Sequence, residues 1–300
     1  MNLRRSPVYC VAIVLTVSTL ALTGSGCRKK PDTTPALATP SFSTNHPRAP
    51  LGSPMEVTYR FAVAPGAHLD QNYRVMVHFL DADDQLMWTD DHNPPTPTTQ
   101  WKPNQTIEYT RTVFIPNYPY IGDASVEMGL YSLATQNRVK LEGKDTGQRA
   151  YRVAKIQLLP QTENVFLIFK DGWWPAEISE NNAAVEWQWT KRASTLAFRN
   201  PKRDCTLYLH LDRPGAGFQE QQTVTVQTGG KTLDNFTVGP RDEVIRKIRM
   251  TAAELGSADM VDVKLLVDKT FVPALLPASN SRDPRELGVR VFHAFVEPRL

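Results

Sequence analysis

The chain has 300 residues, of which 41% are apolar and 9% aromatic, so it can bury ordinary cores and is not disordered throughout. Its 34 Lys and Arg nearly balance 31 Asp and Glu, and two of the basic residues lie within the first five positions. The remainder has no basic surplus with which to neutralise phosphates, which argues against nucleic acid as a partner. The length suggests two domains.

Residues 1–26 have the pattern of a secretory signal. Arg4 and Arg5 form a basic start, and the apolar run Val8–Leu22 has about 15 residues, fewer than the roughly 20 that a membrane span needs. Gly24-Ser25-Gly26-Cys27 resembles the bacterial lipobox, in which small residues precede a cysteine that becomes lipidated. We therefore expect Cys27 to be the lipidation site, with diacylglycerol and palmitate attached. The alternative is an ordinary secretory signal that is cut near Gly26.

The residue after Cys27 is Arg28 rather than Asp, which by analogy with lipoprotein sorting favours the outer membrane, facing the periplasm or the cell surface. Residues 27–54 are rich in proline and show no apolar period, so we predict a disordered tether there. Cys205 alternates with Leu207 and Leu209, which is typical of a small buried hydrophobe and excludes a zinc or CxxC motif.

From residue 55 onward, apolar and polar residues alternate in short runs that end at turn residues, which predicts β-strands. Val75, Val77 and Phe79 share one side of such a run, and the polar cluster 81–85 predicts a hairpin turn after it. No segment has a helical period over ten residues. We therefore predict an all-β chain of two tandem antiparallel β-sandwiches, immunoglobulin-like or jelly-roll-like, at residues 55–159 and 161–300.

Two groups of residues resemble accessory modules of known bacterial proteins. One resembles a β-sandwich module that is appended to large membrane glycosyltransferases and occurs in related envelope lipoproteins, and the other resembles a companion module. The resemblance implies a non-catalytic role in polysaccharide or envelope biology, although the sequence lacks the multi-span membrane domain of those transferases. Asp84 and Asn104 also stand at turn positions where the resemblance leads us to expect glycine. The first group comprises His78, Leu80, Asp81, Asp90, Trp101 and Gly129-Leu130-Tyr131; the second comprises Gly172-Trp173, Glu177, Trp187, Trp189, Asp283, Arg285, Leu287 and Gly288.

Two acidic clusters raise the question of a metal site. Residues 81–84 and 90–92 supply oxygen-rich side chains, but a calcium loop needs six or more ligands at defined spacing, which neither cluster offers. Aspartate is common in turns because its side chain accepts hydrogen bonds from nearby amides. We therefore predict structural turns, with no metal and no other cofactor.

The chain contains neither a G-x-S-x-G elbow nor an H-E-x-x-H motif. His78, His210 and His293 each alternate within a predicted strand, which is typical of packed histidines. The catalytic hypothesis that remains is a carboxylate pair for glycoside cleavage, for which Glu177 and Glu186 are the candidates because they lie next to tryptophans. We predict a protein that is not an enzyme.

Aromatic residues in loops form the candidate binding site, because flat rings can stack on sugars while polar neighbours bind hydroxyls. Trp187 and Trp189 are in line with Val185 and are predicted to be core, and the segment 283–286 is predicted to form a turn with an Arg–carboxylate pair. We expect binding of polysaccharide or of an envelope protein partner. The alternatives are a glycan-active hydrolase or lyase and a purely structural scaffold. The predicted ligand-binding residues are Trp173, Trp174, Glu177, Tyr118 and Tyr120.

Overall fold

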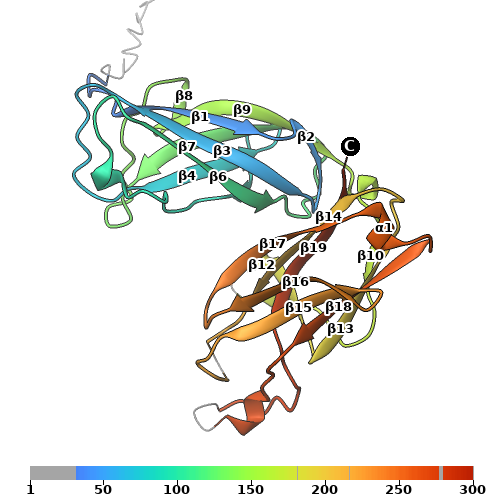
Figure 1. Ribbon diagram of the computed structural model, residues 1–300. Coiled ribbons are helices and arrows are strands. Elements are labelled where there is room, and N and C mark those ends of the chain that lie inside the picture. Colours follow the sequence, from blue (N-terminus) through green and yellow to red (C-terminus); the bar gives the residue numbers. More distant parts are fainter. Residues whose placement is uncertain (1–31, 181, 216, 277–279, 300) are drawn as a thin grey trace, which may run out of the picture. The chain divides into compact units, whose positions relative to one another are not determined.

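The computed structural model describes residues 32–180, 182–215, 217–276 and 280–299. The predicted signal peptide and Cys27 lie outside these residues. The described residues form four β-sheets and one α-helix of four residues, so the all-β prediction is confirmed (Figure 1). Among the described residues, no helix is both long enough and apolar enough to cross a membrane.

The first sandwich combines a sheet of order β1-β3-β6 with a six-stranded sheet of order β2-β9-β7-β4-β5, in which β8 also pairs with β9 (Figure 1). Its strand pairs are antiparallel, as predicted, except that β2 runs parallel to β9. The strands are β1 (Ala38–Thr44), β2 (Arg48–Pro50), β3 (Pro54–Val63), β4 (Arg74–Leu80), β5 (Leu86–Thr89), β6 (Thr106–Phe114), β7 (Gly122–Tyr131), β8 (Asp145–Gly147) and β9 (Ala150–Leu159).

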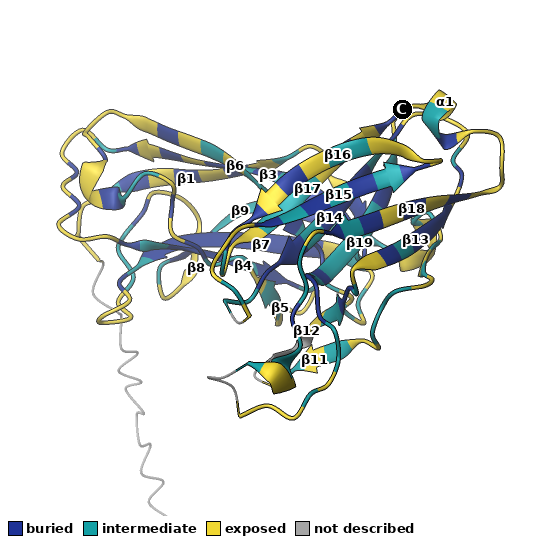
Figure 2. Ribbon diagram, turned by 60° about the horizontal axis from the view of Figure 1, so that its bottom comes forward, coloured by how far each residue is buried: buried dark blue, intermediate teal, exposed yellow. Residues whose placement is uncertain are grey.

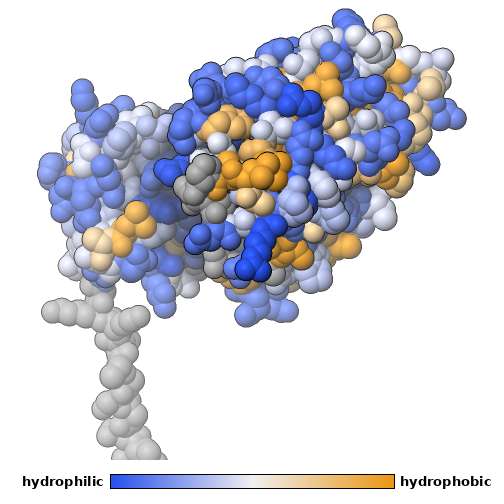
Figure 3. Space-filling model, turned by 90° about the horizontal axis from the view of Figure 1, so that it is seen from below, coloured by the Kyte–Doolittle hydropathy of each residue, from blue (hydrophilic) through white to orange (hydrophobic). Residues whose placement is uncertain are grey.

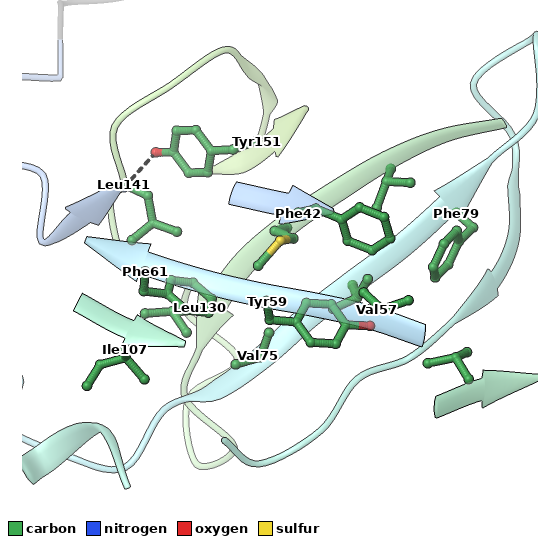
Figure 4. Close-up of a cluster of buried hydrophobic side chains, with 14 of the residues drawn as sticks. Phe42, Val57, Tyr59, Phe61, Val75, Phe79, Ile107, Leu130, Leu141 and Tyr151 are labelled. Carbon is green, nitrogen blue, oxygen red and sulfur yellow. Dashed lines mark hydrogen bonds between the residues drawn. The ribbon is translucent and has the colours of Figure 1, made fainter. Parts of the chain in front are cut away.

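Alternate residues of β3 and β4 form the centre of the first core. Val57, Tyr59 and Phe61 are fully buried, and so are Val75 and Phe79 on the facing sheet. Figure 4 shows these side chains meeting between the strands. Burial of large apolar side chains contributes about 1.5–3 kcal/mol each, so this layer holds the two sheets together.

The prediction of a disordered tether over residues 27–54 is wrong for its second half. β1 pairs with β3 from Ala38 opposite Val63 to Thr44 opposite Val57. The Phe42 ring packs edge-on against Tyr59, with 5.7 Å between ring centroids. The apolar period of β1 is short, and the prolines in β1 and β2 argue against strands at the level of sequence. Both are edge strands, however, and proline is tolerated there because no neighbouring strand needs its missing amide hydrogen.

The second sandwich combines two five-stranded sheets, of order β10-β13-β18-β15-β16 and β11-β12-β19-β14-β17. Along β15, buried and partly exposed residues alternate strictly, as Figure 2 shows by colour. The strands are β10 (Leu167–Phe169), β11 (Glu177–Ser179), β12 (Asn182–Trp189), β13 (Ala193–Arg199), β14 (Cys205–Asp212), β15 (Gln222–Thr228), β16 (Lys231–Val238), β17 (Glu243–Met250), β18 (Met260–Val267) and β19 (Arg290–Pro298); α1 (Ala252–Leu255) and the 3-10 turns η1 (Thr98–Gln100), η2 (Gln161–Glu163) and η3 (Pro273–Leu275) complete the elements.

Several turns form as their sequences predict. Thr251 and Glu254 make a capping box at α1, a pattern in which Thr is followed three residues later by Glu. The Asp81 carboxylate accepts hydrogen bonds from the amides of residues 83 and 85, which is the turn role that we expected for it. Asp84 and Asn104 have φ of 59° and 64°, a left-handed conformation that glycine adopts most readily, which accounts for the expectation of glycine at these turns.

Candidate functional site

The sheet β11-β12-β19-β14-β17 has one face on the second core and an outer face rich in aromatic and charged groups. Leu211 and Val291 are register partners whose side chains are buried in the core. Their neighbours Asp212 and Arg290 are also register partners and point to the opposite side, because side chains alternate along a strand. Trp189 is the partner of Arg290 on β12, so a row of these three residues crosses the outer face.

A pocket of about 600 Å³ opens at one end of this face; we call it the apolar pocket. The loop after β14 and the loop before β19 enclose it, and most of its wall is apolar. Apolar surface also reaches the solvent in separate patches on the side of the molecule that Figure 3 shows. The residues that line the apolar pocket are Glu177, Trp189, Pro214, Gly215, Gly217, Phe218, Gln219, Phe271, Pro273, Leu276, Asp283, Arg285 and Leu287.

Trp189 and Phe271 form the floor of the apolar pocket. Their rings meet edge to face with centroids 5.9 Å apart. Phe271 is bridged to Leu287 by backbone hydrogen bonds in both directions, at 2.9 and 2.8 Å. The side chains of Trp189, Phe271 and Leu287 are each less than 9% exposed, so the floor is rigid. Phe218 and Leu276, which pack against this floor, are only partly buried.

An ion network stands at the rim of the apolar pocket. Arg285 donates from Nη1 to Glu177 at 2.6 Å and from Nε and Nη2 to Asp283 at 2.7–3.0 Å. These hydrogen bonds from Arg285 lower the pKa of Asp283, and in return they raise the pKa of Arg285. Asp283 and Arg285 therefore stay charged at neutral pH. The predicted Arg–carboxylate pair within 283–286 is confirmed, and it extends to Glu177.

Arg213, which is fully buried, shapes the loop on the other side of the pocket. It donates hydrogen bonds to the carbonyl oxygens of Phe218 at 2.7 Å and Glu220 at 3.0 Å. Its guanidinium also lies 4.3 Å from the centre of the Phe218 ring. Burial lowers the pKa of Arg213, but the carbonyl oxygens partly replace its lost hydration. The loop conformation, and with it the position of Phe218, depends on this side chain.

The structure separates the roles of the two adjacent tryptophans. Trp173 donates from Nε1 to the Thr195 carbonyl oxygen at 2.8 Å and packs edge-on against Phe169, as part of the second core. Trp174 instead joins the cluster around Trp189, and its Nε1 donates to the Glu286 carbonyl oxygen at 2.8 Å. Neither ring is a free stacking platform.

Two cations cover Trp174. Lys191 Nζ lies 4.5 Å and the Arg285 guanidinium 5.6 Å from the centre of the indole ring. Arg285 therefore contacts the Trp174 ring and also bonds Glu177 and Asp283. The indole ring thus helps to hold the guanidinium of the rim network in place.

The other predicted residues divide between the sandwiches. Glu177 lines the apolar pocket. Tyr118 and Tyr120 belong to the loop after β6 in the first sandwich, where the Tyr120 hydroxyl donates to the Asp123 carbonyl oxygen at 2.8 Å. The prediction that Trp187 and Trp189 are core holds only in part. Trp189 is buried, at 7% exposed, but in a small cluster with Phe271 and Leu287 on the outer face, and Trp187 is half-buried on the same face.

The two candidate catalytic carboxylates do not face each other. Glu177 is the register partner of Trp187, and Ile178 is the partner of Glu186. Because Glu177 and Ile178 are consecutive in β11, the side chains of Glu177 and Glu186 point to opposite faces of the ribbon. They therefore do not form a pair that flanks one glycosidic bond.

The second acidic cluster forms a buried network in the first sandwich. Asp90 accepts hydrogen bonds from Tyr59 at 2.7 Å and from Arg111 at 3.1–3.3 Å. His92, which is 5% exposed, bonds the Asp90 carbonyl oxygen and the Tyr109 hydroxyl. Burial alone would raise the pKa of Asp90, but hydrogen bonds and the Arg111 charge outweigh it and lower that pKa. Across the described residues, no group of three or more His, Cys, Asp or Glu is placed to hold a metal ion.

Sequence reasoning missed most of the pocket wall. Phe218, Phe271 and Leu276 lie in Gly- and Pro-rich loops without any strand period, and only their apolar character in such loops signalled a role. Arg213 gave no signal, because burial of an arginine is rare and depends on the carbonyl groups that meet it.

No family model matches the chain, and no curated protein matches it. Among solved structures, similarities exist to a family GH115 4-O-methyl-α-glucuronidase with specificity for decorated arabinogalactans (TM-score 0.31, 14% identity, 49% of this chain and 19% of that chain). The CBM36-1 domain of a multidomain xylanase from the hindgut metagenome of Trinervitermes trinervoides gives TM-score 0.26, 8% identity, 46% of this chain and 98% of that chain. The CBM22-1–CBM22-2 tandem domain of Paenibacillus barcinonensis Xyn10C gives TM-score 0.25 and 6% identity, over 83% of this chain and 79% of that chain. Similarities this weak carry no argument about function.

Proposed function

We propose that this chain is a non-enzymatic lipoprotein of the bacterial envelope, attached to the outer membrane through Cys27, that binds polysaccharide in the apolar pocket. The observation that carries the proposal is the pocket itself: a concave site with aromatic walls and a charged rim on a rigid sheet. Such a combination is the usual form of a small-molecule binding site.

The pocket supplies both kinds of contact that a sugar needs. Partly buried Phe218 and Leu276 offer apolar surface to the C–H faces of a ring. Arg285, Glu177 and Asp283 offer N–H donors and carboxylate acceptors to its hydroxyl groups. Because the three side chains fix one another, they lose little freedom when a ligand binds.

The rival function is cleavage of an envelope glycan. Glu177 bonds the Arg285 guanidinium at 2.6 Å, and Glu186 points away from it. A general acid must donate a proton to the leaving oxygen, whereas the Glu177 carboxylate accepts a hydrogen bond from Arg285. This arrangement favours binding without turnover.

The test is retention of the purified chain on immobilised bacterial polysaccharides, followed by analysis of glycan length. Phe218→Ala and Arg285→Ala should each weaken retention about tenfold. This corresponds to a loss of about 1.4 kcal/mol in binding free energy from the removed contacts. Leu275→Ala is the matched control, because Leu275 is 77% exposed and does not line the pocket. It should leave retention unchanged.

Three results would reject the proposal. Shortening of the glycan that Glu177→Gln abolishes would indicate a hydrolase or lyase. Absence of retention on every polysaccharide, together with an envelope protein that co-purifies, would indicate a protein-binding scaffold. Equal retention of Phe218→Ala and the unchanged chain would mean that the apolar pocket is not the site.

A further inference from the structure

A second hollow, of about 420 Å³, lies on the same outer face as the apolar pocket; we call it the histidine pocket. Trp187 lines it and Trp189 lines the apolar pocket. These two residues are two apart on β12, so they share a face and lie about 6.6 Å apart along the strand. The residues that line the histidine pocket are Ser179, Val185, Glu186, Trp187, His210, Asp212, Glu243, Arg290, Phe292 and His293.

Arg290 stands between the two pockets. It pairs with Asp212 through two hydrogen bonds, of 2.8 and 2.5 Å, which fix the plane of its guanidinium. The Arg290 Cζ atom lies 4.9 Å from the centre of the Trp187 ring and 5.8 Å from the centre of the Trp189 ring. A ligand that crosses from one pocket to the other would therefore pass over a single fixed group.

The charges of the histidine pocket do not favour an anion. Glu186, Asp212 and Glu243 contribute three carboxylates against the one guanidinium of Arg290. The hydrogen bond from His210, at 2.6 Å, lowers the pKa of Glu243 and keeps it ionised. Burial lowers the pKa of His293 to about 3, so that imidazole is neutral at pH 7. No positive charge is left over to bind a phosphate or a uronate.

Two polar atoms in the pocket wall have no hydrogen-bond partner among the described residues: Trp187 Nε1 and His210 Nδ1. Both are buried, and an unpartnered buried polar atom costs about 1–3 kcal/mol. His210 Nε2 donates to the Glu243 carboxylate, so in the neutral imidazole Nδ1 is an acceptor, whereas the indole N–H is a donor. A hydroxyl group can satisfy either atom, because it both donates and accepts.

We infer that the histidine pocket is a second subsite, which binds an uncharged, hydroxyl-rich unit of the same polysaccharide that occupies the apolar pocket. The inference rests on the proposed function and deepens it: the ligand is a neutral glycan chain held across at least two units, with Arg290 between them. Trp187 and Phe292 supply the apolar contacts, and His210, Glu243 and Asp212 supply the polar ones.

The test uses the full chain with ¹⁵N-labelled tryptophan, whose six indole N–H signals are assigned by Trp→Phe variants. The probes are neutral hexasaccharides of glucose, xylose and mannose, their disaccharides, and hexagalacturonate. A neutral hexasaccharide should shift the Trp187 signal. The Trp101 signal is the internal control, because its Nε1 already donates to the Thr96 carbonyl oxygen in the first sandwich.

Two variants test the polar contacts. His210→Ala should weaken hexasaccharide binding about tenfold, as expected for the loss of one hydrogen bond to a buried partner, and should change disaccharide binding by less than about twofold. Glu243→Ala should have the same effect, and it lies on the edge strand β17 with a side chain 64% exposed, so it leaves the fold intact.

The outcomes separate the two proposals. If Phe218→Ala weakens every saccharide while His210→Ala, Glu243→Ala and the Trp187 signal show no effect, the second subsite is rejected and the proposed function stands. If no saccharide binds, both are rejected. If hexagalacturonate binds more tightly than every neutral hexasaccharide, the assignment of a neutral ligand is rejected.

Discussion

Arg285 donates a hydrogen bond to Glu177 at 2.6 Å across 108 residues of chain, and this contact ties β11 to the loop that precedes the last strand. The same guanidinium bonds Asp283, so one side chain fixes two segments of the pocket rim. The rim of the apolar pocket therefore contributes to the stability of the second sandwich.

Arg285→Ala should lower the free energy of unfolding by about 1–2 kcal/mol, because it removes the guanidinium that pairs with two partly buried carboxylates, Glu177 and Asp283. Denaturant unfolding measures the change. Lys170→Ala is the control, since its pair with Asp262 is more exposed on both sides and should contribute less than about 0.5 kcal/mol. Equal losses in the two variants would contradict the structural role of Arg285.

Asp90→Ala should destabilise the first sandwich by about 2–4 kcal/mol, because it removes the shared acceptor of Tyr59 and Arg111 from a largely buried site. Urea unfolding followed by tryptophan fluorescence measures this. Asp83→Ala, in an exposed turn, is the control and should change stability by less than about 0.5 kcal/mol. A loss below about 1 kcal/mol for Asp90→Ala would mean that water replaces its contacts.

Acid should weaken the first sandwich through Asp90. Its pKa is lowered in the folded state, so its contribution is fully present above the unfolded pKa of about 3.9 and is lost as the pH falls through the folded pKa. Unfolding measured between pH 7 and pH 2 should show a steep loss below about pH 4. In Asp90→Asn that loss should be shallower, and identical slopes would show that other carboxyl groups dominate.

Gly172→Ala should cost more than about 2 kcal/mol, because φ is +83° there and a Cβ atom would lie 1.9 Å from the Ala193 carbonyl oxygen. Gly229→Ala is a matched control: φ is +54° and no atom lies within 4 Å, so the expected loss is about 1 kcal/mol, from the backbone alone. Thermal unfolding compares the two, and equal losses would show that the segment around Gly172 moves away.

Arg213→Met should loosen the loop that carries Phe218, because the carbonyl oxygens of Phe218 and Glu220 lose their donors. The expected loss of stability is about 1–3 kcal/mol. Limited proteolysis should cut the loop 214–221 faster in this variant, and Arg249→Met, at an exposed arginine of β17 in the same sandwich, should leave the cleavage rate unchanged. Unchanged cleavage in Arg213→Met would show that the loop is held by other contacts.

Alternation alone was sufficient to predict the central strands, because Val57, Tyr59 and Phe61 must share a face in any extended chain. It failed for β1, whose three buried residues include a proline and an alanine. The sequence pointed to Glu177, which lines the apolar pocket, but not to Phe218 or Phe271. Those residues come together through loop conformations that depend on Arg213 and Arg285, and such long-range contacts leave no periodic mark in a sequence.

β1 covers one edge of β3, and removing the proline-rich stretch as though it were a dispensable linker would expose that edge. A chain trimmed to begin at Met55 would present the free amide and carbonyl groups of β3 to any neighbouring molecule, and would be prone to strand exchange and aggregation. Recombinant forms of the protein should therefore begin upstream of Ala38.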